Sequence, residues 1–235
     1  MTSDTAFDAN EIEKLRELIT PARFVLWDFD GPLCRLFAGL RAEQVVAGLV
    51  EWLERRGLHG LLTDSEREAP DPEAVLRAVG RRQPGSDLVA ELEERLTQEE
   101  LRAVAFALPT SYADPLIRTW TAVGVRMAVT TGNSPHTVRA YLESRGLVDC
   151  FSPHIYGRTH RLDRALTGMT APPSRTLMIG DTVSDLEAAR EAGVPFLGCA
   201  RHEGRERSLR AAGAELVVSS LEPLLMLLRS PERLP

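Results

Sequence analysis

Three short apolar runs, each ending in acidic or hydroxyl side chains, constrain the fold of this 235-residue chain more than any other feature. They are FVLWD (24–28), VRMAVTT (125–131) and TLMIGD (176–181). The runs are apolar at successive positions, which is typical of strands buried on both faces of a parallel sheet. Weaker runs predict further strands at HIYG (154–157), VPFLGC (194–199) and AELVVSS (214–220).

Helical segments with readable ends separate these runs. Ser134-Pro135 predicts one helix start, and Gly146 follows the last turn of that helix. Residues 181–192 predict another helix, which Gly193 ends. Strand and helix therefore alternate from about residue 125 onward, so the sequence predicts an α/β fold with a Rossmann-like parallel sheet flanked by helices.

Residues 38–112 break this alternation, being rich in Leu, Ala, Glu and Arg at helical spacing without a convincing strand. Helix starts are predicted at Asp71-Pro72 and at Thr97, where TQEE would form a capping box with Glu100. We therefore expect an all-helical inserted domain over 38–112. We also expect an amphipathic helix over 8–19 in an N-terminal arm (1–22), and a core domain formed by 23–37 with 113–235.

Composition excludes several function classes. The formal charge of −6 argues against a protein whose main partner is a nucleic-acid backbone. No apolar run approaches the roughly 20 residues of a membrane span, and the first residues, MTSDTAFDANEIEK, lack the basic and apolar regions of a signal peptide. We expect a cytoplasmic protein whose 43% hydrophobic residues supply its own core.

The cysteines and histidines indicate no soft-metal site. Cys34, Cys150 and Cys199 are widely separated and form no CxxC pair, so free thiols are expected. The five histidines show no HxxxH spacing. Lys14 is the only lysine, so any chemistry that needs a lysine elsewhere is excluded.

One stretch of this acidic chain is basic: IYGRTHRLDR (155–164) carries three arginines and a histidine. A solvated loop, a nucleic-acid contact and the cationic wall of an anion site all fit these residues. The stretch alone does not decide among them.

Acidic residues follow the strongest predicted strands at the edge where open parallel sheets bind ligands. Asp28 and Asp30 stand in DFDG, Thr131 in TTGN, and Asp181 and Asp185 in GDTVSD. Alone, DFDG could be a tight turn, and GDTVSD could be a helix start with Asp181 as its cap. Together, four carboxylates would repel one another without a cation, so we expect a hard divalent ion with oxygen ligands, Mg²⁺ in the first place.

This ordered set resembles the haloacid dehalogenase-like superfamily, in particular phosphatases with a helical cap inserted after the first strand, such as phosphoglycolate phosphatases. FVLWDFDGPL is similar to the first motif of that family, VRMAVTTGN to the second and LMIGDTVSD to the fourth. The resemblance covers about residues 23–228, and the helical insert falls where the cap belongs. It implies a phosphoric monoester hydrolase that acts on a small phosphorylated metabolite.

The resemblance also implies roles for single residues. Asp28 would be the nucleophile that forms an aspartyl phosphate, and Asp30 the general acid and base. Mg²⁺ would be held by the Asp28 side chain, the Asp30 backbone carbonyl and Asp181, with Asp185 nearby or acting through water. A second acid two residues after the nucleophile separates this chain from the dehalogenases, and the lack of a cap lysine excludes phosphonoacetaldehyde cleavage.

Phosphate contacts are implied by the second motif and by its surroundings. Thr131 would bond a phosphoryl oxygen, with Gly132 and Asn133 beside it at a helix start. The third motif departs from the family, which usually places a lysine there. Arg158 is our first choice for that cation, Arg161 the second, and Arg164 a further candidate. Arginine can hold two oxygens at once, but it is bulkier than lysine.

The sequence does not identify the substrate. Arg35, near the start of the insert, could contact a polar leaving group. A sugar phosphomutase similar to β-phosphoglucomutase is the alternative within the same fold. A catalytically weak binding or regulatory protein is the alternative from another class. The protein is expected to be a monomer or a homodimer with no nucleic-acid or membrane partner.

Overall fold

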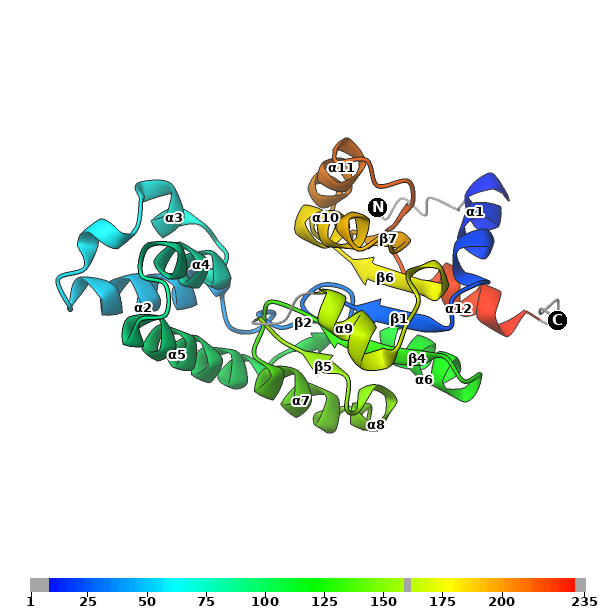
Figure 1. The fold of residues 1–235 in the computed structure, drawn as a ribbon, viewed down its shortest axis with the longest axis horizontal. Coiled ribbons are helices and arrows are strands. Elements are labelled where there is room, and N and C mark those ends of the chain that lie inside the picture. Colours follow the sequence, from blue (N-terminus) through cyan, green and yellow to red (C-terminus); the bar gives the residue numbers. More distant parts are fainter. Residues whose placement is uncertain (1–8, 159–161, 231–235) are drawn as a thin grey trace. The chain divides into compact units, whose positions relative to one another are not determined.

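The computed structural model describes residues 9–158 and 162–230, and in this part of the chain a parallel sheet lies between helices (Figure 1). Its strand order is β5-β4-β1-β6-β7-β8, and every neighbouring pair is parallel. The strands are β1 (Phe24–Trp27), β4 (Arg126–Thr130), β5 (Ile155–Tyr156), β6 (Thr176–Gly180), β7 (Phe196–Cys199) and β8 (Val217–Val218). All six predicted strands are present, although β5 and β8 pair over only two residues each.

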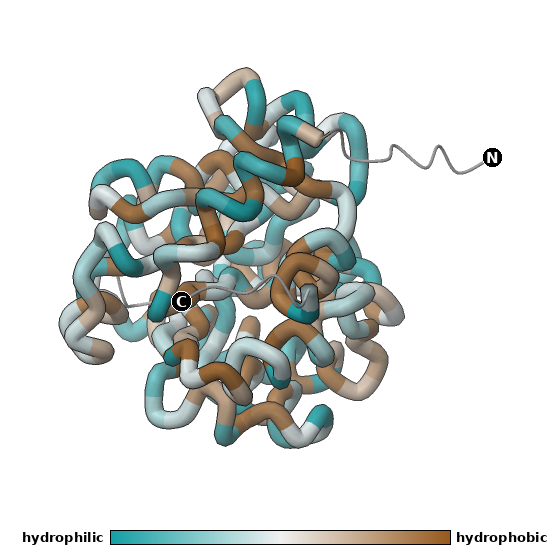
Figure 2. The backbone as a smooth tube through the Cα atoms, turned by 90° about the vertical axis from the view of Figure 1, so that its right-hand side faces the viewer, coloured by the Kyte–Doolittle hydropathy of each residue, from teal (hydrophilic) through white to brown (hydrophobic). Residues whose placement is uncertain are grey.

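Helices precede, connect and follow these strands along the chain. They are α1 (Ala9–Ile19), α2 (Ala42–Glu54), α3 (Asp64–Glu68), α4 (Pro72–Arg82), α5 (Asp87–Val104), α6 (Ala113–Ala122), α7 (Pro135–Ser144), α8 (Val148–Phe151), α9 (Leu162–Met169), α10 (Val183–Glu191), α11 (Glu203–Ala211) and α12 (Glu222–Arg229). Short 3₁₀ turns lie at His59–Leu61 and Pro173–Arg175. Hydrophobic and hydrophilic residues alternate within single helices, as the colouring in Figure 2 shows. This pattern lets each helix bury one side and hydrate the other.

The sheet is buried on both faces, as its continuous apolar runs predict. On one face Leu26, Ala128 and Met178 form a cluster with buried residues of α9 and α10. On the other face Trp27 meets Trp120 of α6 edge to face, with 5.8 Å between ring centroids. Residues that follow one another in a strand therefore contact different helices, and the α/β fold class is confirmed.

The chain divides into two compact units. Unit 1 comprises 1–34, 109–131 and 142–235, and unit 2 comprises 35–108 and 132–141. A two-stranded sheet of β2 (Cys34–Arg35) and β3 (Leu108–Pro109) lies where the chain passes between them. The expectation of no strand within 38–112 was therefore wrong for β3, which pairs over only two residues and leaves no periodic signal.

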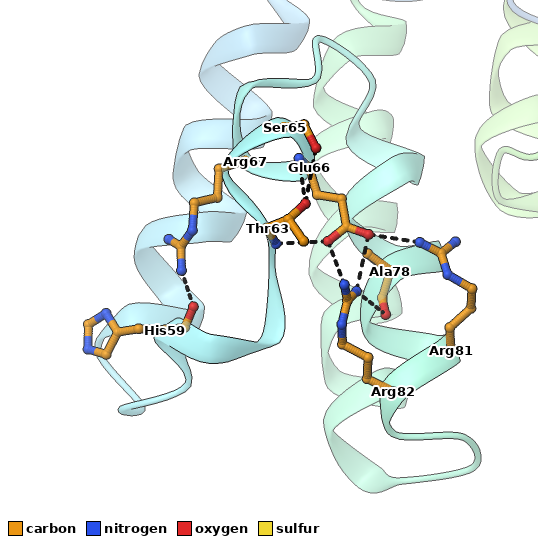
Figure 3. Close-up of polar contacts among 8 residues, drawn as sticks. All are labelled: His59, Thr63, Ser65, Glu66, Arg67, Ala78, Arg81 and Arg82. Atoms are coloured by element: carbon orange, nitrogen blue, oxygen red, sulfur yellow. Dashed lines mark hydrogen bonds and ion pairs between the residues drawn. The ribbon is translucent and has the colours of Figure 1, made fainter.

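Unit 2 has a hydrophobic core of its own, supplied by α2, α4 and α5 and including Leu49, Val75 and Leu92. Figure 3 shows a polar cluster at its α3–α4 contact, centred on Glu66. Glu66 accepts from the Thr63 backbone N–H at 2.9 Å in a capping box, and it pairs with Arg81 and Arg82 at 2.9 Å each. The Thr63 hydrogen bond and Arg82 lower the pKa of Glu66 to about 2. This carboxylate thus fixes the start of α3 against α4.

The predicted helix start at Thr97 was wrong, because α5 runs without interruption from Asp87 to Val104. Thr97 and Glu100 are both buried inside this helix, so they form no capping box. The fully buried carboxylate of Glu100 instead accepts three hydrogen bonds at 2.9–3.1 Å, from Asn133 Nδ2, Ser134 N and Thr137 Oγ1. A TQEE pattern looks the same in sequence whether its acid caps its own helix or another one.

Candidate active site

The acidic residues after β1 and β6 lie at the carboxyl ends of two neighbouring strands. Asp28 directly follows β1, and its backbone N–H donates to Ile179 O of β6 at 2.9 Å. Asp181 directly follows β6. Because β4, β1 and β6 are adjacent and parallel, the residues after their ends meet at one edge of the sheet.

Three carboxylates converge at this edge. Asp28, Asp181 and Asp185 each offer an oxygen atom, and these atoms lie within 4.8 Å of one another. The exposed fractions are only 8% for Asp28 and 7% for Asp181. Like charges at this distance and with this burial destabilise one another, so the cluster favours either protons or a cation.

The environment of Asp28 opposes its ionisation. Burial raises the pKa of Asp28 well above its usual value, and the charges of Asp185 and Asp181 raise it further. A hydrogen bond from the Phe29 backbone acts in the opposite direction. A positive charge nearby would therefore stabilise the anionic form of Asp28.

Asp181 is the carboxylate with spare coordinating capacity. Burial raises the pKa of Asp181 to about 7, against the lowering effect of Arg205, whose Nη1 lies 3.2 Å from Asp181 Oδ2. The second oxygen, Oδ1, is buried and has no hydrogen-bond partner within the described part of the chain. A buried carboxylate oxygen of this kind is a suitable ligand for a metal ion.

Asp185 joins the cluster from the first turn of α10. Thr182, and not Asp181 as the capped-helix interpretation held, is the N-cap of this helix, because Thr182 and Asp185 form the capping box. Asp185 Oδ2 accepts from Asp181 N at 3.1 Å and from Thr182 Oγ1 at 2.7 Å. These hydrogen bonds fix Asp185 beside Asp181, so that Asp185 can help to orient the Asp181 carboxylate.

Asp30 stands two residues after Asp28 in a tight loop. Asp30 is half buried and forms an isolated bridge with Cys34. Gly31 follows with φ of +139°, and a Cβ there would lie 2.6 Å from Asp181 Oδ2. Only glycine allows the loop to approach Asp181 this closely.

The predicted phosphate-binding residues of the second motif follow the end of β4. Thr131 is half buried, and its backbone N–H donates to Tyr156 O at 3.0 Å. Gly132 lies against the Glu73 carboxylate, and buried Asn133 donates to Glu100 at 3.1 Å. Pro135 begins α7 at the predicted position. The roles of Thr131, Gly132 and Asn133 in phosphate binding stay predictions.

The basic residues of the third motif are only partly described. Arg158 lies two residues after the end of β5 and is half buried, whereas Arg164 is exposed on α9. Arg161 lies outside the described residues. Arg35 is exposed in β2 and belongs to unit 2. The choice of Arg158 and the substrate contact of Arg35 stay predictions.

Two cations that the sequence reasoning missed act on the carboxylate cluster. Arg205 pairs with Asp181, and Arg201 also lowers the pKa of Asp181. Both follow β7, Arg201 in the connection to α11 and Arg205 within that helix. The carboxyl-end rule, applied to GCARHEGRER (198–207) after the predicted strand, could have found them.

A divalent cation with oxygen ligands fits these residues. The buried Asp181 Oδ1 and the raised pKa of Asp28 both indicate a place for positive charge. Among the described residues the group consists of three carboxylates, and this set of oxygen ligands matches the preference of Mg²⁺. Asp28, Asp181 and Asp185 are the residues that would hold the ion.

Comparison with known proteins agrees with this geometry. A family model described as haloacid dehalogenase-like hydrolase matches residues 22–193. No curated protein matches the chain in sequence.

The described part of the chain contains no helix long and apolar enough to cross a membrane.

Solved structures share the fold. A protein from Bacteroides fragilis described as a haloacid dehalogenase-like hydrolase is 21% identical with a TM-score of 0.64, over 86% of this chain and 99% of that one. A predicted phosphatase from Clostridium acetobutylicum is 19% identical with a TM-score of 0.62, over 86% and 96%. CbbY from Rhodobacter sphaeroides, solved with phosphate, is 20% identical with a TM-score of 0.61, over 85% and 94%.

Proposed function

Because the chain belongs to the haloacid dehalogenase-like hydrolases, we propose that it hydrolyses a phosphate monoester of a small metabolite with Mg²⁺ as cofactor. The observation that carries this proposal is the convergence of Asp28, Asp181 and Asp185 within 4.8 Å at the carboxyl edge of the sheet. A substrate that brings two or more negative charges to such a site needs a cation beside it. The phosphate in the related CbbY structure supports the same substrate chemistry.

In the proposed first step Asp28 attacks phosphorus. A bond forms between its carboxylate oxygen and phosphorus, and the bond from phosphorus to the ester oxygen breaks. Asp30 gives its proton to the leaving oxygen, which departs as an alcohol. A Mg²⁺ ion held by the carboxylates would neutralise charge, so that an anionic nucleophile can approach an anionic phosphate.

In the second step a water molecule attacks the phosphorus of the aspartyl phosphate. Asp30, now ionised, takes a proton from this water, and Asp28 leaves as a carboxylate with the release of inorganic phosphate. Thr131 would hold a phosphoryl oxygen through both steps. Arg158 would balance the charge of the phosphoryl group in place of the usual lysine.

Removing Mg²⁺ with a chelator is expected to abolish phosphate release from p-nitrophenyl phosphate, and adding Mg²⁺ back should restore it. Burial raises the pKa of Asp181 to about 7, so protons compete with the metal below that pH. The Mg²⁺ concentration that gives half the maximal rate should therefore fall about tenfold between about pH 6 and about pH 8.

The two other functions that the sequence leaves open predict different results when phosphorylated metabolites are the substrates. A phosphomutase would form an isomer from a sugar phosphate with little phosphate release. A binding protein would retain Mg²⁺ without turnover of any phosphorylated metabolite. Phosphate release that continues unchanged in the presence of the chelator would contradict the proposed cofactor.

A further inference from the structure

Thr110 makes a hydrogen-bond contact with the loop that carries Asp30, although it is 79 residues away from its partner in sequence. Its hydroxyl donates to Gly31 O at 2.6 Å, and its backbone N–H donates to Leu33 O at 3.1 Å. Thr110 is 5% exposed and lies just after β3. All three residues belong to unit 1. The segment that returns from β3 is thus bonded twice to the loop that follows β1.

The direction of these bonds is fixed by the chemistry of the partners. Arg201 Nη1 lies 3.3 Å from Thr110 Oγ1, and a guanidinium group can only donate. The Gly31 carbonyl can only accept. The Thr110 hydroxyl therefore accepts from Arg201 and donates to Gly31, so that its proton has one defined position.

This hydroxyl completes the fixation of both peptide groups around Gly31. The Gly31 N–H donates to Cys34 O at 2.7 Å, which holds the peptide group that contains the Asp30 carbonyl. The Gly31 carbonyl belongs to the next peptide group, and Thr110 holds it. Glycine has few conformational restraints of its own, and Gly31 has φ of +139°. Without the Thr110 hydroxyl, the hydrogen bond to Cys34 would still hold the peptide group before Gly31, but the peptide group after Gly31 would lose the hydrogen bond that limits its rotation.

We infer that Thr110 is a positioning residue of the proposed reaction, which keeps Asp30 in place by holding the Gly31 carbonyl. This inference rests on the proposed function only for its effect on turnover. Its structural part, the fixation of the loop, stands on the contacts of Thr110 alone. Asp30 must reach both the leaving oxygen and the attacking water, and an error of about 1 Å in such a group costs up to about 10²-fold in rate.

Thr110→Val tests the inference, because valine keeps the branched shape of threonine and removes the hydroxyl. We expect kcat for p-nitrophenyl phosphate to fall about 10-fold to 100-fold while KM changes less than about threefold. Hydrogen exchange of the Gly31 amide, measured by NMR, should become faster in the same protein. Thr110→Ser keeps the hydroxyl and should restore both kcat and slow exchange to near the wild-type values.

Thr119→Val is the matched control, because the Thr119 hydroxyl also donates to a backbone carbonyl, that of Pro115 at 2.8 Å, in the same unit. It should leave kcat and Gly31 exchange unchanged. If Thr110→Val does not fold, the smaller Thr110→Ala takes its place with the same expected result. Wild-type kcat and exchange without the hydroxyl would overturn the inference, and so would a Thr110→Ser protein as impaired as Thr110→Val. Absence of turnover in the wild type would contradict the proposed function, while Gly31 exchange would still decide on Thr110.

Discussion

Asp28→Asn is expected to reduce phosphate release from p-nitrophenyl phosphate by a factor of about 10³ or more, because an amide cannot form the covalent phosphoryl intermediate. The loss should appear in kcat and should persist at saturating Mg²⁺. Asparagine has the shape of aspartate and removes one of three crowded carboxylates. Since burial and the neighbouring acids raise the pKa of Asp28, the variant should be at least as stable as the metal-free wild type.

Asp149→Asn is the control for this change, because Asp149 is an exposed carboxylate on α8 in the same unit. Its phosphate release should match that of the wild type. Thermal unfolding of both variants shows whether the protein remains folded. A folded Asp28→Asn protein with more than about a tenth of wild-type activity would mean that another group attacks phosphorus.

Arg158→Ala is expected to lower kcat about 10²-fold, because it removes a charged donor that would face the phosphoryl group in the transition state. Arg164→Ala is the matched control on the same stretch, and it should stay within about twofold of the wild type, since Arg164 is exposed on α9. Phosphate release from p-nitrophenyl phosphate measures both. Arg158→Lys, which restores the usual residue type of the family, should retain more activity than Arg158→Ala.

Arg161→Ala belongs in the same series, because Arg161 is the second candidate for this role. A large loss in Arg161→Ala with little effect in Arg158→Ala would transfer the role to Arg161. Equal small losses in Arg158→Ala and Arg161→Ala would direct attention to Arg201 and Arg205, which act on Asp181. These two arginines follow β7, whereas Arg158 follows β5 on the opposite side of β1 in the sheet.

The strands that position the site could be predicted because burial on both faces leaves a strong signal in sequence. FVLW, MAV and LMI are apolar at consecutive positions, and the structure places them in β1, β4 and β6. Order along the chain, together with the carboxyl-end rule, then predicts which acids meet. Asp28, Asp181 and Asp185 do meet at the edge predicted for them.

What the sequence could not indicate depends on contacts between distant segments. TQEE predicts a capping box by its spacing, but Glu100 instead binds Asn133, Ser134 and Thr137, more than 30 residues away. Thr110 is an ordinary β-branched residue until its contact with Gly31 is known. Spacing rules describe neighbours within one element, and these contacts join different ones.

The central claim is that Asp28 carries the phosphoryl group during turnover. Acid quenching during turnover of p-nitrophenyl phosphate, followed by peptide mass spectrometry, tests it directly. The Asp30→Asn variant should accumulate the intermediate, because it lacks the base that activates water for its hydrolysis. The account predicts a phosphorylated peptide with the modification on Asp28 in this variant, and none in Asp28→Asn. Phosphorylation of another residue, or phosphate release with no phosphorylated protein in either the wild type or Asp30→Asn, would contradict it.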